Sequence, residues 1–417
     1  MISRLPLSLL ALLLCAPLAA AQPMPASQPS SQPSTQPPGP LATPLPPPAL
    51  PPAEAVAAVP HEAERVAQPS RAGGMLEEDL DVDKVVLRRG GFRLAVGALL
   101  QVQGAFYVGD GSSMAEKDPA ETEGFRIRRA RFGLAGDLFH DVGYYLAVDL
   151  KDTVAAALGG DHGTEILDAK IEWHRFPWAR VSAGLSKVPL SAFELQSSAR
   201  LLMIERPLVV RWLSPEYRVG LTVEGSWRRL QYGVGFYNGS EGITSGNRLA
   251  GLAGAFRVQY TLFDRPAAFV PCCFNITVGG AYMIDDGPTV LLHRAAGSLG
   301  LRFPRGALLA ELLWQSSKPH DAPAAEPDAG AVRRWGVAGE AGVFVFRDIL
   351  QLAARYEYFR DSDLLETFGK QQLISGGLNA YLYRDHLKLQ VSYTRRDELS
   401  GPEVPNDIGF AQLQAMF

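Results

Sequence analysis

Basic side chains are the residues of this 417-residue chain whose type and spacing suggest chemistry. Many of them occupy polar positions of short segments in which polar and apolar residues alternate. In a β-strand, residues i and i+2 lie on one face, so this spacing gathers the cations on a shared polar face. Rows of Arg or Lys attract anions, most strongly between low-dielectric walls. The strand pattern yields these candidate anion-contacting residues: Arg129, Arg131, Arg218, Arg257, Arg294, Arg302 and Arg334.

Acidic residues fall on the same polar faces and leave the cations a modest excess. They are Asp137, Asp149, Asp168, Glu172, Glu224, Glu311, Glu340 and Glu357, and the further basic residues on these faces are Lys151, Lys170, Arg355 and Lys388. Two interpretations remain open. The charges either set selectivity toward anions, or they pair with one another across neighbouring strands as structural ion pairs.

A connection of about residues 191–216 lacks a clear strand pattern and is rich in large apolar residues, among them Phe193, Leu201 and Ile204. Long connections of this kind are usually functional or disordered. This one is too apolar to extend into water, so we expect it to fold inward and narrow the space between the strands. Three further candidates, Arg200, Arg206 and Arg211, would lie at that narrowing. Alternatively they solvate a surface loop or pair with Glu194, Glu205 and Glu216.

Other chemistries find little support. The seven histidines show no metal-ligand spacing, and the chain has no Gly-rich phosphate loop, nucleophile elbow or Cys-x-x-Cys motif. The net charge of −4 gives no attraction to nucleic acid. We therefore expect neither an enzyme, nor a cofactor, nor a metal site.

The segments that must position the cations alternate apolar and polar residues from Gly91 to the terminal Phe417. Leu387, Leu389, Val391 and Tyr393, for example, alternate with Lys388, Gln390 and Ser392. The connections between segments alternate short and long, as in outer-membrane barrels with short periplasmic turns and longer external loops. The sequence predicts an all-β fold: a transmembrane antiparallel β-barrel of about 16 strands over residues 91–417.

The part of the chain before Gly91 differs in composition from the alternating segments. Residues 1–21 have the basic start, apolar stretch and small-residue end of a secretory signal peptide. Residues 22–75 form a Pro/Ser/Ala-rich tract that cannot bury enough apolar surface to fold, so we expect a disordered linker. Residues 76–90 read as a charged transition segment. These features predict the outer membrane of a Gram-negative bacterium, with the linker in the periplasm and able to contact peptidoglycan.

Three stretches resemble the phosphate-selective porin O and P family. They are Gly124–Gly136, Gly184–Ser198 and Ile204–Leu221. The resemblance implies a sixteen-stranded, usually trimeric barrel that passes small anions such as phosphate or polyphosphate. Arg129, Arg131 and Lys187 are the basic positions that match the family's motifs, and Lys187 joins the candidate residues on this ground. Where the family has a Lys-Glu-Pro-Phe-like run, this chain has Lys187-Val188-Pro189-Leu190, with one charge fewer.

The sequence as a whole predicts a diffusion channel for small hydrophilic solutes with a preference for anions. The expected partners are outer-membrane lipid, two further copies of the chain in a homotrimer, and permeant anions, with no nucleic acid. The alternative is a structural or adhesive barrel tethered to the cell wall through its Pro-rich arm.

Overall fold

The structure, a computed structural model, describes residues 85–108, 123–139, 141–151, 165–176, 178–239, 251–266, 273–321, 330–362, 369–401 and 403–417. The expected signal peptide, the Pro-rich linker, residues 76–84 and Cys272 lie outside these ranges, so the predictions made for them remain predictions.

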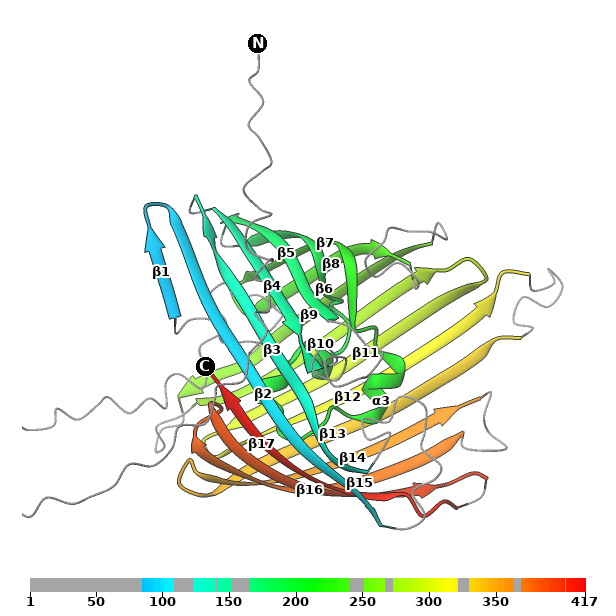
Figure 1. The fold of residues 1–417 in the computed structure, drawn as a ribbon. Helices are drawn as coiled ribbons and strands as arrows, with labels where there is room; N and C mark the ends of the chain where they lie inside the picture. Colours follow the sequence, from blue (N-terminus) through cyan, green and yellow to red (C-terminus); the bar gives the residue numbers. More distant parts are fainter. Residues whose placement is uncertain are drawn as a thin grey trace, which may run out of the picture. The chain divides into compact units, whose positions relative to one another are not determined.

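Sixteen antiparallel strands close into a barrel (Figure 1), as expected. From β2 to β17 each strand pairs with the next one in sequence, and β17 pairs with β2 to close the barrel. The strands are β2 (Phe92–Val108), β3 (Gly124–Leu138), β4 (Val142–Asp149), β5 (Glu165–Phe176), β6 (Ala179–Lys187), β7 (Tyr217–Trp227), β8 (Leu230–Asn238), β9 (Leu252–Pro266), β10 (Cys273–Asp286), β11 (Val290–Phe303), β12 (Gly306–Pro319), β13 (Val332–Phe346), β14 (Leu350–Asp361), β15 (Lys370–Tyr383), β16 (Leu387–Glu398) and β17 (Asp407–Met416).

A seventeenth strand, β1 (Val85–Arg89), forms within the segment expected to be a charged transition. It pairs with β2 from Val85↔Val96 to Arg89↔Phe92. The same edge of β2 pairs with β17 from residue 99 onward, and Phe417 exchanges backbone hydrogen bonds with Ala98. β1 therefore lies end to end with β17. It covers the edge of β2 that the stagger of a closed barrel leaves unpaired.

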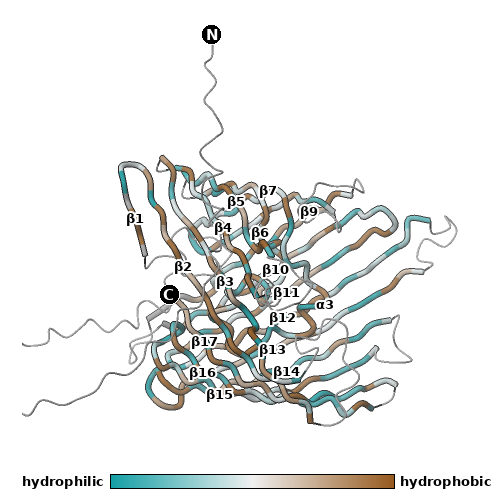
Figure 2. Tube along the Cα trace, viewed as in Figure 1, coloured by the Kyte–Doolittle hydropathy of each residue, from teal (hydrophilic) through white to brown (hydrophobic). Residues whose placement is uncertain are grey.

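The apolar faces of the strands point outward, and hydropathy alternates along the strands in Figure 2. On β17, for instance, Leu413 is 47% exposed whereas Gln412 is 2% exposed. Aromatic side chains such as Trp173 and Trp178 are also exposed near strand ends. This suits the aromatic girdles of a membrane interface. Four non-glycine residues with positive φ, Phe139, Arg228, Arg347 and Arg384, mark four of the tight turns.

One apolar residue departs from the expected alternation. Strict alternation predicts Leu167 on the outer face with Ala169, Ile171 and Trp173, but the pairing of β4 with β5 shifts between Ala147 and Val148. This irregularity turns Leu167 inward, where it is 4% exposed and packs in a cluster with Tyr145 and Ala199. An extra residue in one strand reverses the parity of the residues on one side of it.

The segment between β6 and β7 folds into the barrel. It contains α2 (Ala192–Leu195), the 3₁₀ turn η2 (Ser198–Arg200) and α3 (Leu208–Leu213). Its backbone carbonyl oxygens accept hydrogen bonds from side chains of β2, β9, β14, β15 and β16, the donors being Gln101, Arg257, Arg355, Asn379 and Lys388. Strands so widely separated around a closed barrel can meet one segment only in the lumen. We call residues 188–216 the inner loop.

The wall and the inner loop share a hydrophobic core, which positions the loop. Val188, Leu190, Phe193, Val209 and Val210 pack against Leu313, Ala338 and Phe359 of the wall. Trp212 also stacks on Phe359 with ring centroids 4.2 Å apart. In the described part of the chain, no helix has the length and apolar character needed to cross a membrane.

Candidate functional site

Four arginines of β3 point into the lumen, two more than the alternating pattern predicts. The pairing of β2 with β3 skips Arg128, because Gln101 pairs with Arg129 and Val102 with Ile127. This bulge places Arg126 and Arg128 on the same side as Arg129 and Arg131. The residue types in this segment indicate the bulge. Only a bulge allows Phe125, Ile127, Ala130 and Phe132 all to face lipid, where a charge is costly.

Glu205 of the inner loop lies at the centre of these arginines. Its carboxylate accepts a bidentate pair of hydrogen bonds from Arg128, at 2.6 and 3.0 Å. Guanidinium nitrogens of Arg129 and Arg211 lie 3.5 and 3.7 Å from its oxygens, and the Gln103 amide donates to it at 3.1 Å. One carboxylate thus faces three guanidinium groups and an amide, a geometry suited to oxyanions.

The surrounding arginines keep the Glu205 carboxyl group ionised. Burial alone would raise the pKa of its carboxyl, but Arg128 and Arg129 more than offset this and hold the pKa well below the ordinary value of 4.5. Glu205 therefore remains anionic at neutral and mildly acidic pH.

A second group of contacts fixes the start of the inner loop. Arg131 donates to Asp149 of β4 and to the Ser198 hydroxyl, both at 3.0 Å. Arg206 donates to the same hydroxyl at 3.3 Å and to the carbonyl oxygen of Gln196 at 2.7 Å, and it lies 3.4 Å from Glu194. Arg206 therefore cross-links the loop to itself as well as contributing charge.

Arg218 of β7, Arg257 of β9 and Arg294 of β11 belong to two further ion-paired groups. Arg218 and Arg294 lie 2.8 and 3.6 Å from Asp285 of β10. Arg257 is only 1% exposed, lies 3.9 Å from Glu311 and donates to the Leu190 carbonyl oxygen at 2.7 Å. These residues match the alternative of structural ion pairs, and Arg257 also anchors the loop.

The remaining candidates differ in exposure. Arg334 pairs with Asp361 at 2.6 Å and keeps about a third of its side chain exposed. Lys187 is buried at the end of β6 and donates to the Gln196 carbonyl oxygen at 3.1 Å. Arg200 and Arg302 are exposed. Arg200, Arg302 and Arg334 are thus the candidates most open to a passing solute.

The basic excess gathers where β3 meets the inner loop. Six arginines there (Arg126, Arg128, Arg129, Arg131, Arg206 and Arg211) face three carboxylates (Asp149, Glu194 and Glu205), an excess of three positive charges. We call this group the arginine cluster. Arg218, Arg257, Arg294, Arg302 and Arg334 lie outside it.

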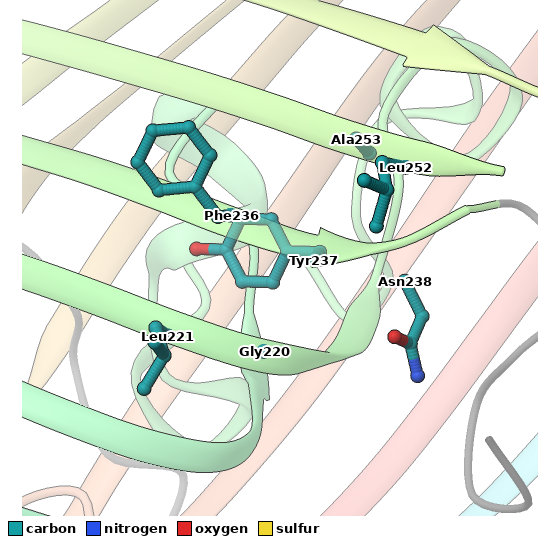
Figure 3. A pocket seen from close by; sticks show the side chains of 7 residues that line it. All are labelled: Gly220, Leu221, Phe236, Tyr237, Asn238, Leu252 and Ala253. Atoms are coloured by element: carbon teal, nitrogen blue, oxygen red, sulfur yellow. The ribbon is translucent and has the colours of Figure 1, made fainter. Parts of the chain in front are cut away.

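One small cavity adjoins the cluster, and a larger one lies away from it. The small cavity, of about 40 Å³, lies between the inner loop and the walls of β14–β17, lined by Glu205, Arg206, Arg355 and Arg396 among others. It has room for water molecules beside the loop. The other, of about 170 Å³, lies among β7, β8 and β9 (Figure 3). Its exposed Leu221, Phe236 and Leu252 side chains face outward, so it belongs to the apolar outer surface.

No group of three or more His, Cys, Asp or Glu side chains within the described ranges has a geometry that would hold a metal ion. Residues 100–261 match the family described as "Phosphate-selective porin O and P", so the family resemblance is confirmed over this stretch. No curated protein matches the chain at a significant level of similarity.

Solved porins share the fold. An anion-selective porin from Comamonas acidovorans superposes with a TM-score of 0.53 at 12% identity, covering 78% of this chain and 100% of the porin. OmpT of Vibrio cholerae gives 0.53 at 11% identity, covering 80% and 100%. OmpF of Salmonella typhi, in complex with daunomycin, gives 0.55 at 11% identity, also covering 80% and 100%. The chain is thus a porin-like β-barrel whose stretch from residue 100 to 261 carries the sequence pattern of the phosphate-selective porin O and P family.

Proposed function

We propose that this protein is an outer-membrane diffusion channel for small hydrophilic solutes with a preference for anions. The observation that carries the proposal is the arginine cluster, in which six guanidinium groups face three carboxylates beside the inner loop. Its excess positive charge lies between low-dielectric walls, which strengthens its field on a passing ion. Arg129 and Arg131 are buried and the other four arginines are only partly exposed, so the cluster acts on a solute chiefly through this field.

Exposed cations would make the direct contacts. Arg200 and Arg302 are exposed and Arg334 is about a third exposed, and we propose that they meet the solute while the arginine cluster sets the potential. The family match and the anion-selective porin from Comamonas acidovorans support this preference, and phosphate or polyphosphate are the candidate solutes that the family resemblance suggests.

Reconstitution of the full chain in planar bilayers tests the proposal. In a potassium chloride gradient, the sign of the reversal potential should report faster passage of chloride than of potassium. A folded sample with no conductance would support the structural or adhesive alternative instead. That alternative has one observation in its favour, since wall residues such as Lys388, Gln101 and Gln390 are 0–1% exposed beside the inner loop.

Two finer points belong to the same proposal. The family resemblance suggests a homotrimer, which light scattering on the detergent-solubilised chain would detect. The Pro-rich residues 22–75 would extend into the periplasm, where a pull-down with purified peptidoglycan would test for binding.

A further inference from the structure

Arginines occupy three of the short turns at the end of the barrel opposite to the long connections. Arg228 and Arg229 form the turn between β7 and β8, Arg305 lies between β11 and β12, and Arg347 lies between β13 and β14. Short turns are periplasmic in barrels of this type. All four residues are exposed, and we call them the periplasmic arginines.

The backbone of these turns does not require arginine. Arg228 and Arg347 have φ values of 55° and 46°, in the left-handed region where glycine and asparagine are favoured and most other residues cost free energy. Among the non-glycine residues with positive φ in the described chain, three of four are arginines, the third being Arg384. The guanidinium group, rather than the backbone geometry, is therefore the feature that needs an explanation at these positions.

An aromatic ring lies beside each of these two guanidinium groups. The Cζ atom of Arg228 lies 5.1 Å from the ring centroid of Trp227, and that of Arg347 lies 5.5 Å from the centroid of Phe346, which are cation–π distances. Trp227 is 63% exposed and Phe346 is 55% exposed, and each is the last residue of its strand. Aromatic residues at such positions mark the membrane interface. The guanidinium groups, one residue further from the membrane centre, therefore lie at the depth of lipid headgroups.

The other two periplasmic arginines extend the positive charge along the rim of the barrel. Arg229 donates from one guanidinium nitrogen to a backbone carbonyl oxygen of β9 at 3.2 Å. The Arg305 carbonyl oxygen accepts a hydrogen bond from the Phe344 backbone N–H at 2.7 Å, which joins its turn to the one that holds Arg347. Beside the four arginines, these three turns hold one acidic residue, Asp348, so their combined charge is positive.

We propose that the periplasmic arginines bind the phosphate groups of anionic phospholipids in the inner leaflet of the outer membrane. A guanidinium group presents paired donors that match two phosphate oxygens. Stacking on an aromatic ring orders this group before the lipid binds, which lowers the entropy cost of binding. The inference goes beyond the channel proposal, because it rests on the placement of the barrel in a membrane and not on conductance.

Photolabelling of the full chain in nanodiscs tests this assignment. Two photoreactive probes with identical acyl chains, a phosphatidylglycerol and a phosphatidylcholine, are compared in discs of phosphatidylcholine. Peptides that contain the three turns should be labelled roughly tenfold more by the phosphatidylglycerol, given the attraction that each basic residue exerts on an anionic lipid. The preference should disappear in R228N/R229Q/R305Q/R347N.

Two variants control for folding and for charge. R228N/R347N places asparagine, which tolerates positive φ, in two of the turns. Its melting temperature in neutral detergent should not fall below the parent's, while labelling by the phosphatidylglycerol decreases. R175Q removes an exposed arginine at the same end of the barrel that lies 3.8 Å from the Asp141 carboxylate, and it should leave the preference unchanged. Labelling does not depend on conductance, so failure here is separable from failure of the channel proposal.

Four results would overturn the assignment. Equal labelling by the two probes would show that the turns do not select an anionic headgroup, and a preference that survives in the four-residue variant would show that other residues select it. A lower melting temperature of R228N/R347N in neutral detergent would make the arginines structural. Loss of the preference in millimolar inorganic phosphate would assign the arginines to free phosphate rather than to lipid.

Discussion

At the scale of single residues, replacing Glu205 and replacing its arginines should change the ratio of anion to cation permeability in opposite directions. Glu205→Gln removes the carboxylate that neutralises part of the cluster, so the ratio of anion to cation permeability should rise. Replacing Arg128 and Arg129 by Gln removes two positive charges from the same place and should lower that ratio. Reversal potentials in a salt gradient measure both. Glu165→Gln is the control. Glu165 is about half exposed, and its single ion pair, with Lys151, is long at 4.0 Å, so removing its charge should change the permeability ratio little.

The same carboxylate also predicts how stability depends on pH. Because the folded-state pKa of Glu205 lies well below its ordinary 4.5, its ion pairs stabilise the barrel above that pH and lose this effect as the pH falls toward the lowered value. Leaving the buried arginines unpaired should cost about 3–5 kcal/mol. Urea unfolding of Glu205→Gln at pH 7 should show this loss. A Gln variant as stable as the parent would contradict the central role of Glu205.

At the scale of elements, the bulge in β3 predicts that deleting Arg128 and deleting Ile127 have different effects. Without Arg128 the rest of the strand alternates regularly, so Arg126 stays in the lumen and Phe125 and Ile127 stay toward lipid. Without Ile127 the change of parity places either Arg126 or Arg128 on the lipid face. A cation there costs about 2–4 kcal/mol at the midplane and less near the interfaces. Heat-modifiable electrophoretic mobility should report a folded barrel for the Arg128 deletion and a much reduced folded fraction for the Ile127 deletion.

The same strand shows how far the sequence could predict this molecule. Alternation of polarity, together with the alternating short and long connections, predicted a closed barrel of about sixteen strands, because lipid and water impose opposite polarity on neighbouring residues. The apolar residues of the connection 191–216 predicted an inner loop. Alternation missed Arg126 and Arg128 because a bulge changes the parity of the chain, and Leu167 was misplaced for the same reason. It also missed β1, whose five residues read as a charged segment. Which arginines pair and which stay exposed depends on contacts far apart in sequence, such as Arg128 with Glu205.

At the scale of the whole molecule, the inner loop and the wall stabilise each other. The wall's Lys388 donates to the carbonyl oxygens of Ala199 and Leu201, at 3.1 and 3.2 Å, and Glu311 accepts from the Ser191 hydroxyl at 2.6 Å. Buried backbone groups of the loop require such partners. Charged wall residues that the sequence suggested as solute contacts therefore also bind the inner loop. This explains why many of them are buried.

This mutual support predicts the effect of removing the loop. Lys187 and Tyr217 are paired residues at its two ends, so a short Gly-rich turn can replace residues 191–214 without separating β6 from β7. Single-channel conductance should rise several-fold because the segment that narrows the lumen is gone. The anion preference should fall, since Glu205, Arg206 and Arg211 leave while the β3 arginines gain water to screen them. The urea midpoint should drop, because the core around Phe193 and Val209 is lost. If conductance stays at the parent's value in a folded sample, solutes do not pass beside the inner loop.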